Sequence, residues 1–470
     1  GGDHGAAKFV LSSETPENGS SPTSGAVLEA AVDPAVLSLI SLPVALRSEL
    51  GSGSNPGFRV RIHQANQIGG TGLPTFIYRA EQQLAGLVDT NAADLTLASN
   101  GVFNPSGIIN WNQDAGGAGD VGNFRADSTP AFPDDPIPGI PGIGSFVDRR
   151  TDNIAGELIT YVEFPAAGVY SMGVNSDDGF SVTATDQPPA NNLGLYVQAG
   201  GQTSAYYAAS GGTDKGGVFR PITAPLVGKL VIADPPLADA PIKNGAAIAG
   251  NIAVIDRGVN TFSAKVGFAR EAGAIGVVIV NNRDPDSADG KFPIVMGGAL
   301  VDLPAVMISR PQGAALKASM AAGEATARIA PDTTRYLGSF DGGRGASDSI
   351  FAFNVAQAGV YPLRLVWFEG GGGANLEWFS VTAAGDKVPL NAPGNPAALK
   401  AFRARAFVPP PPVDPTVAAA YDGTDVVITF QGKLQSSPTV DGPFTDVTAT
   451  SPLRVPAASA AGNLFYRARR

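Results

Sequence analysis

An internal repeat constrains the fold of this chain more than any other feature of its sequence. The first copy runs from Glu157 to Ala184, and a degraded second copy runs from Ser349 to Ala383. Both copies contain Ala-Gly-Val-Tyr, and both end on Phe-Ser-Val-Thr-Ala. Apolar residues alternate with polar or small ones in each copy, which predicts two or three β-strands. Two such antiparallel units, far apart in the chain, predict one sandwich whose sheets bury each other's inner face. We expect one shared core, with contributions from Tyr170, Tyr361, Phe180, Phe379 and Trp378.

The segment between the two copies has a different pattern and predicts an α/β insertion. Its apolar runs indicate short buried strands, and its helices carry stop and start signals such as Gly273 and a cap at Thr261 or Ser263. The expected elements are strands at 226–233 and 250–255, a helix at 263–272, strands at 276–280 and 303–309, and a helix at 313–322.

Composition narrows the class of protein. The 59 glycines, the 38 prolines and a charged fraction of only 16 % favour a turn-rich, mainly β chain over a helical one. The formal net charge of −10 argues against nucleic acid and anionic membrane surfaces as partners. No run reaches the ~18 apolar residues that a membrane-spanning helix needs, and without cysteines there is no disulfide or thiolate zinc chemistry.

The predicted fold class is therefore mainly β and multidomain. We expect a jelly-roll-like β-sandwich that is split by an α/β domain and followed by a small C-terminal β-sandwich. The start of the chain lacks a basic stretch followed by an apolar core, so we expect a processed leader or a fragment of a longer protein. The expected parts are a leader at 1–57, sandwich at 58–220, insert at 221–332, sandwich again at 333–405, a proline-rich linker at 406–415 and a C-terminal module at 416–470.

Catalytic signals are scarce. The two histidines, His4 and His63, lie in a polar leader and within a predicted strand, and no metalloprotease, serine-hydrolase or phosphate-loop motif occurs. This census predicts that the chain is not an enzyme and has no catalytic residues and no bound organic cofactor.

Carboxylates offer the remaining chemistry. Asp177 and Asp178 lie in a tight turn whose oxygens suit Ca²⁺, although a turn in which one Asp caps backbone N–H groups is an equally good interpretation. A second acidic run contains Asp284, Asp286 and Asp289. It has one residue too many for a calcium loop and lacks the final Glu, which favours a solvated acidic loop.

Two stretches resemble known families. The Gly-Val-Tyr strand followed by Asn175-Ser-Asp-Asp-Gly-Phe180 resembles the glycan-binding β-sandwich family named after the anthrax protective antigen, over 58–200 and again over 333–400. Ile255-Asp-Arg-Gly258, Ala272-Gly-Ala-Ile-Gly-Val277 and Pro304-Ala-Val306 resemble the protease-associated domain. That resemblance implies a non-catalytic domain that accompanies proteases and binds substrates or partners. The C-terminal module resembles immunoglobulin-like or fibronectin-like modules of bacterial surface proteins.

These features lead to the functional hypothesis of a non-catalytic, secreted or cell-surface protein of bacterial type, used for binding or assembly. The form considered first is a self-assembling filament or surface-layer subunit, in which the apolar strand expected at 8–11 pairs head-to-tail with another copy. The leader packing on its own chain is the open alternative. Glycans or surface proteins are the other expected partners, and the alternative functions are a glycan-binding adhesin or an accessory region of a larger secreted hydrolase.

Overall fold

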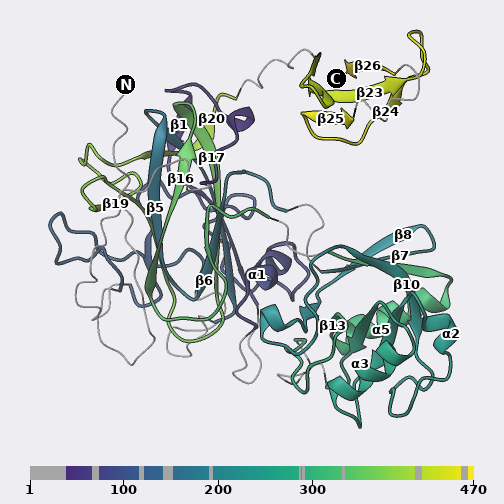
Figure 1. Ribbon diagram of the computed structural model, residues 1–470. Coiled ribbons are helices and arrows are strands. Elements are labelled where there is room, and N and C mark those ends of the chain that lie inside the picture. The colour runs from purple at the N-terminus through teal and green to yellow at the C-terminus, as the bar shows by residue number, and fades with distance from the viewer. Residues whose placement is uncertain are drawn as a thin grey trace. The chain divides into compact units, whose positions relative to one another are not determined.

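The computed structural model describes residues 39–65, 73–115, 121–140, 152–189, 194–284, 287, 290, 292–330, 334–407, 415–456 and 464–469. The chain divides into two compact units, 1–407 and 408–470 (Figure 1). Strands dominate the described residues, which confirms the mainly β, multidomain fold class. The predicted strand at 8–11 and most of the proline-rich linker lie outside the described residues.

The first unit contains the predicted β-sandwich. The described strands of one sheet are, in spatial order, β1 (Gly53–Pro56), β20 (Lys400–Arg405), β4 (Ile154–Phe164), β17 (Gly359–Glu369), β6 (Gly179–Thr183) and β15 (Gly338–Phe340), with β2 (Arg59–Gln64) also on β4. Those of the other sheet are β16 (Ser347–Val355), β5 (Gly168–Asp177), β18 (Asn375–Val381) and β19 (Lys387–Pro389), with β3 (Asn110–Asn112) on β18.

The two repeat copies interlock in this sandwich. In the first copy, β4 and β6 lie in the larger sheet and β5 lies in the smaller one. In the second copy the assignment is reversed, with β17 in the larger sheet and β16 and β18 in the smaller one. As a result β17 pairs between β4 and β6, and β5 pairs between β16 and β18. The middle strand of each copy thus completes the other copy's sheet, and the Ala-Gly-Val-Tyr turns connect the two sheets.

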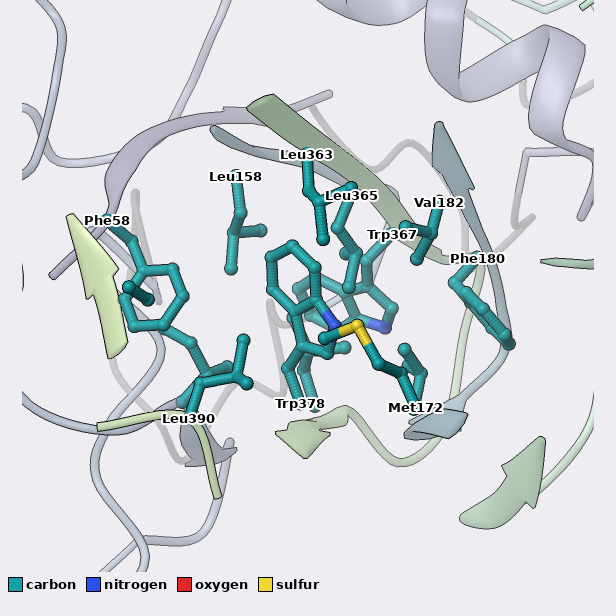
Figure 2. Close-up of a cluster of buried hydrophobic side chains, with 14 of the residues drawn as sticks. Phe58, Leu158, Met172, Phe180, Val182, Leu363, Leu365, Trp367, Trp378 and Leu390 are labelled. Carbon is teal, nitrogen blue, oxygen red and sulfur yellow. The ribbon is translucent and has the colours of Figure 1, made fainter. Parts of the chain in front are cut away.

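One core fills the space between the sheets, as the repeat predicted. Figure 2 shows Trp367 of one sheet beside Trp378 and Met172 of the other. Tyr361 and Phe180 contribute to this core, and Tyr170 packs against it. Phe379, also expected in the core, is buried on the opposite face of β18, where its ring meets Phe124 edge-on at 5.7 Å. The expectation for Phe379 was wrong because Trp378 takes the inward position, and successive strand residues point to opposite faces.

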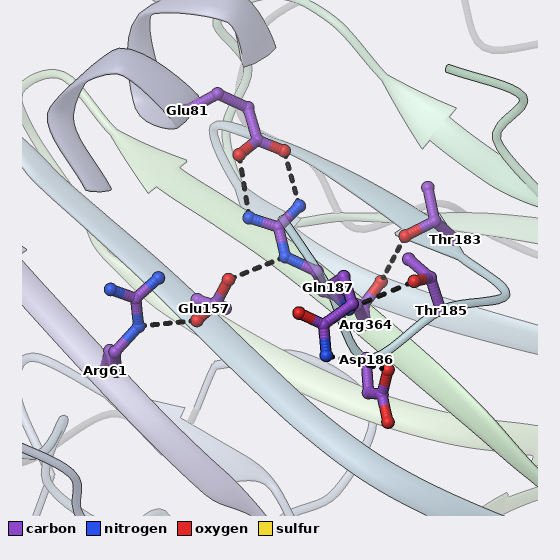
Figure 3. Close-up of polar contacts among 8 residues, drawn as sticks. All are labelled: Arg61, Glu81, Glu157, Thr183, Thr185, Asp186, Gln187 and Arg364. Carbon is purple, nitrogen blue, oxygen red and sulfur yellow. Dashed lines mark hydrogen bonds and ion pairs between the residues drawn. The ribbon is translucent and has the colours of Figure 1, made fainter. Parts of the chain in front are cut away.

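The outer face of the larger sheet carries α1 (Ile77–Leu84). Ile77 and Ala80 of this helix pack against Val366 and Phe368 of β17. Two residues before Val366 on the same strand, Arg364 pairs with Glu81 of the helix and with Glu157 of β4 (Figure 3). Alternate residues of β17 therefore serve the sandwich core and the helix contact.

Residues near the start of the described chain belong to the sandwich. Leu42 is fully buried in the core cluster, Ser48 bridges to Val360, and β1 pairs with β20. A 3₁₀ turn, η1 (Val44–Leu46), connects these contacts. The end of the predicted leader is therefore a packed part of the sandwich and not a solvated tail.

The insert is built on a second large sheet. Its described strands are, in spatial order, β8 (Gln202–Tyr206), β7 (Leu195–Ala199), β14 (Ala325–Ile329), β10 (Leu226–Ile232), β11 (Ile252–Asp256), β12 (Gly276–Val280), β13 (Ala305–Ile308) and β9 (Ala209–Ser210). The strands β10 to β13 are parallel to one another. This sheet takes in β7, β8 and β9, which precede residue 221, the predicted start of the insert. Their alternating pattern suits either sheet, and the pairings of β7 with β14, β8 with β7 and β9 with β13 assign them to this one.

Helices cover both faces of the parallel strands (Figure 1). On one face, α3 (Phe262–Glu271) and α2 (Gly245–Ile248) pack on a core that includes Ile255 and Ile279. On the other face, Leu316 of α5 (Arg310–Ala321) belongs to a buried cluster that includes Val254 and Val278. Another 3₁₀ turn, η3 (Thr213–Lys215), precedes the parallel strands.

The N-terminal caps of α3 and α5 explain where these two helices begin. Thr261 caps α3, as the sequence allowed, by accepting from Ala264 N at 3.2 Å. The helix α5 begins at Arg310, before the predicted start at 313, because Ser309 and Gln312 form a capping box.

The C-terminal unit is a small pair of sheets. One contains β21 (Thr416–Tyr421), β22 (Asp425–Gln431) and β25 (Leu453–Pro456), and the other contains β24 (Thr445–Asp446), β23 (Lys433–Ser437) and β26 (Phe465–Arg469). Ile428 and Leu434 are almost fully buried there. This is the small C-terminal β-sandwich that the sequence predicted.

Candidate functional site

Three carboxylates meet at one end of the sandwich. Asp177 ends β5, Asp178 follows it at once, and Glu369 ends β17. One carboxylate oxygen from each residue lies within 4.8 Å of the others. We call these three residues the carboxylate trio. It forms where the chain crosses from one sheet to the other, so residues far apart in the sequence converge there.

Main-chain N–H groups orient the trio. Asp178 accepts from Arg344 N at 2.9 Å through Oδ1 and from Gly370 N at 2.8 Å through Oδ2. Glu369 accepts from Asp178 N at 3.1 Å through Oε2. Trp367 fixes the turn by donating from Nε1 to Asp177 O at 2.7 Å. The prediction that an Asp of this turn accepts backbone N–H bonds agrees with the contacts of Asp178. The main-chain N–H groups named here occupy only one of the two carboxylate oxygens of Glu369.

Glycines let the chain approach the carboxylates closely. A Cβ on Gly179 would lie 2.5 Å from Phe340 O, and one on Gly373 would lie 2.5 Å from Asp177 Oδ2. Both distances are shorter than the contacts that real Cβ atoms make. The space around this site therefore explains the glycines at positions 179 and 373.

Two arginines near the trio direct their donors largely to neutral oxygens. Arg344 donates to Asp178 O at 3.2 Å and to Ser176 Oγ at 2.9 Å, and its guanidinium stacks on Phe340 with 4.2 Å to the ring centroid. Arg79 is fully buried and donates to main-chain carbonyls, among them Glu369 O at 3.4 Å. Burial lowers the pKa of Arg79 to about 10.

The trio holds protons at neutral pH. Burial, followed by the charges of Asp178 and Asp177, raises the pKa of Glu369 to about 9. Burial and the charge of Asp178 raise the pKa of Asp177 to about 7, and burial raises the pKa of Asp178 as well. Glu369 is fully buried, and its Oε1 has no hydrogen-bond partner within the described part of the chain. Without a cation the three groups therefore share protons, since three buried carboxylates cannot all be charged.

The trio offers only carboxylate oxygens as metal ligands, and this limits which ion it suits. Catalytic zinc is held by histidine or cysteine together with carboxylates, and the trio contains neither. His63, the one histidine among the described residues, is buried and hydrogen bonds to Gln83 at 3.1 Å. The residues present do not fit zinc. They fit a hard cation that prefers oxygen ligands.

Sequence reasoning found two of the three carboxylates and missed the third. Asp177 and Asp178 both belong to the trio, and their binding of a metal stays a prediction. Glu369 was not found because it lies in the second repeat copy. The glycine run that follows it was the available signal. Of the acidic run, Asp284 follows β12 and its main-chain oxygen accepts from Ser287, while Asp286 and Asp289 lie outside the described residues.

Comparisons with known proteins identify one part of the chain. Residues 222–316 match the family model of the PA domain, which coincides with the α/β insert from β10 into α5. The match covers the insert alone, so the resemblances of the sandwich and of the C-terminal module remain predictions. No curated protein matches the chain.

Solved structures with similar parts come from peptidases. A zinc aminopeptidase from Bacillus subtilis is 19% identical with a TM-score of 0.21, over 42% of this chain and 36% of that one. An aminopeptidase from Aneurinibacillus sp. strain AM-1 is 21% identical with a TM-score of 0.19, over 39% and 37%. A peptidase M28 precursor from Shewanella amazonensis SB2B is 17% identical with a TM-score of 0.17, over 42% and 39%. The chain spans little more than a third of each, and at these TM-scores the likeness assigns no catalytic residue.

These comparisons correct the functional hypothesis. The expectations that the chain is not an enzyme and is a non-catalytic binding or assembly protein are contradicted, because the matched structures are peptidases. The alternative of an accessory region of a larger secreted hydrolase agrees better with the findings. Within the described part of the chain, no helix is both long enough and apolar enough to cross a bilayer.

Proposed function

We propose that this chain is the PA-domain region of a secreted peptide-hydrolase system, and that it presents peptide substrates or the hydrolase partner through its α/β insert. The observation that carries this proposal is the PA-domain match over residues 222–316. The split sandwich then acts as the scaffold that holds the insert.

An exposed apolar surface of the insert supports this role. Val259 follows β11 and is 85% exposed, and Leu300 is 77% exposed. Their loops are joined, because Ser263 Oγ donates to Ala299 O at 2.7 Å. Val259 lies beyond the carboxyl end of a parallel strand, where open α/β sheets usually bind ligands. Large apolar side chains exposed this fully suit contact with an extended peptide or a protein partner.

We assign Ca²⁺ to the carboxylate trio as part of the same proposal. Two oxygens that bind one Ca²⁺ at about 2.3 to 2.6 Å lie at most roughly 5 Å apart. One oxygen of each trio residue lies within 4.8 Å of the others, which is inside that limit. Mg²⁺ usually keeps several waters and is held by one or two carboxylates, so three protein carboxylates suit Ca²⁺ better. The ion would replace the shared protons and fix the crossing between the sheets.

The test of the proposed function measures peptide binding and peptide hydrolysis by the purified chain. Fluorescent peptide pools are titrated into the wild type and into V259S/L300S, with L97S as the control because Leu97 is 89% exposed on the sandwich part. We expect weaker binding in V259S/L300S alone. Cleavage of aminoacyl-p-nitroanilides by the chain itself would place the catalytic centre within it. Equal binding by all three proteins would count against the role of the insert.

A further inference from the structure

A second set of buried oxygens lies on the outer face of the smaller sheet. Asn375 of β18 is paired with Asn112 of β3, and Glu377 with Asn110. Residues opposite each other in an antiparallel pair point to the same face, as do alternate residues of one strand. Trp111, which lies between the two asparagines of β3, is part of the sandwich core. The four polar side chains therefore form a layer on the other face.

The segment 121–135 covers this polar layer. Asn123 N and Phe124 N donate to Glu377 Oε1 at 2.7 and 2.9 Å. Under this cover Asn110 and Asn375 are each only 1% exposed, and Asp134, which belongs to the covering segment, is 8% exposed. The oxygens of these side chains are thus removed from bulk water.

The amide nitrogens in the layer all have acceptors. Asn110 Nδ2 donates to Phe132 O at 3.0 Å, Asn112 Nδ2 donates to Asp134 Oδ2 at 2.8 Å, and Asn375 Nδ2 donates to Asn175 Oδ1 at 2.8 Å. If the oxygen and the nitrogen of any of these amides changed places, the amide oxygen would face the oxygen that now accepts the hydrogen bond. The orientation of each amide is therefore fixed by its neighbours.

Three oxygens have no hydrogen-bond partner among the residues that the structure describes. They are Asn110 Oδ1, Asp134 Oδ1 and Asn375 Oδ1. All three side chains adjoin Asn112: Asp134 through its hydrogen bond, Asn375 as its cross-strand partner, and Asn110 two positions earlier on the same face. Buried acceptors without donors are rare in folded proteins, and one of these belongs to an acidic group.

We propose that Asp134, Asn110 and Asn375 bind a divalent cation beneath the segment 121–135. Carboxylate and amide oxygens are ligands that Ca²⁺ takes in proteins, and its coordination is flexible enough for a mixed set. This site is separate from the carboxylate trio in its ligands, although Asp177 flanks Asn375 on β5. The two sites can be distinguished by substitution.

The test counts Ca²⁺ ions bound per chain by isothermal titration after treatment with EDTA. The substitution D134N removes the charge and keeps the shape of the side chain. Its control is D127N, because Asp127 lies on the same segment with a side chain 78% exposed. E369Q removes one ligand of the trio. We expect D134N to bind one ion fewer than the wild type, D127N to bind as many, and E369Q to retain the Asp134 site.

Thermal unfolding gives a second measurement that does not require the bound ions to be counted. In EDTA, D134N should melt at the same temperature as the wild type or higher, since it carries one buried charge less. In Ca²⁺, the wild type should gain more in melting temperature than D134N, because the ion binds only the native state. Equal ion counts and equal shifts for the two proteins would overturn the proposal, as would binding that E369Q alone abolishes.

Discussion

Arg364 holds Glu81 through two parallel hydrogen bonds of 2.5 and 2.7 Å, with both side chains almost fully buried between the larger sheet and α1 (Figure 3). Glu157 takes the remaining edge of the guanidinium at 2.6 Å and is in turn paired with Arg61. The four charges balance, which is what makes their burial tolerable.

Neutralising one member of this network should therefore destabilise the sandwich. We expect E81Q to lower the free energy of unfolding by on the order of 3 kcal/mol, because Glu157 is then shared by two arginines and one positive charge of the network lacks a balancing carboxylate. E49Q is the matched control, since Glu49 makes the same two-bond contact with Arg47 at 2.7 and 2.8 Å on the surface. Urea unfolding should detect no change for E49Q. A small effect of E81Q would show that the network is dispensable.

The carboxylate trio predicts how stability depends on pH in the absence of a cation. The pKa values of Asp177 and Glu369 are about 7 and about 9 in the folded chain, above their ordinary values. Groups with a raised pKa stabilise the fold below their unfolded pKa, and this stabilisation is lost as pH rises through the folded pKa. The chain in EDTA should therefore lose stability between about pH 5 and pH 9, by up to roughly 1.4 kcal/mol per pH unit for each proton.

The substitution E369Q checks this assignment. It removes one shared proton, so its stability should fall less steeply over the same pH range than that of the wild type. Glu377 has a pKa of about 7 through burial and keeps part of the slope in both proteins. Identical slopes for the two proteins would show that Glu369 does not take up a proton on folding.

The cap of α5 gives a prediction for the insert. S309A removes the side chain that accepts from Gln312 N, and should cost about 1 kcal/mol of stability. S319A is the control, because Ser319 is half-buried in the body of the same helix, away from its cap, and its hydroxyl donates to Ala315 O at 3.1 Å. Chemical unfolding followed by circular dichroism compares the two, and equal stabilities would argue against the capping box.

Two glycines in helices of the insert should respond in opposite ways to alanine. A Cβ on Gly313 of α5 would lie 2.1 Å from Val280 Cγ1, so G313A should be destabilising. A Cβ on Gly267 of α3 meets no atom within 4 Å, and G267A should stabilise by about 0.5 to 1 kcal/mol. Melting temperatures of the two variants should move in opposite directions from the wild type.

Local patterns predicted much of this fold, whereas contacts between distant residues did not follow from them. Alternation and glycine placement indicated the sandwich strands, and the cap at Thr261 marked the start of α3. The pairing of β7 with β14 and the inward position of Trp378 depend on which strands become neighbours, which periodicity does not encode. The position of Glu369 beside Asp177 and Asp178 also depends on which strands become neighbours, so the sequence pattern did not predict it.

The interlocked repeat also has a consequence for synthesis on the ribosome. β4 ends at Phe164, and its partner β17 begins at Gly359, beyond the whole insert. The first copy therefore emerges with unpaired strand edges, and the insert can complete its own sheet before the sandwich closes. Exposed edges of this kind attract other chains. The sandwich can close only when the second copy emerges. Translation therefore lets the insert, in the middle of the sequence, fold before the sandwich that flanks it.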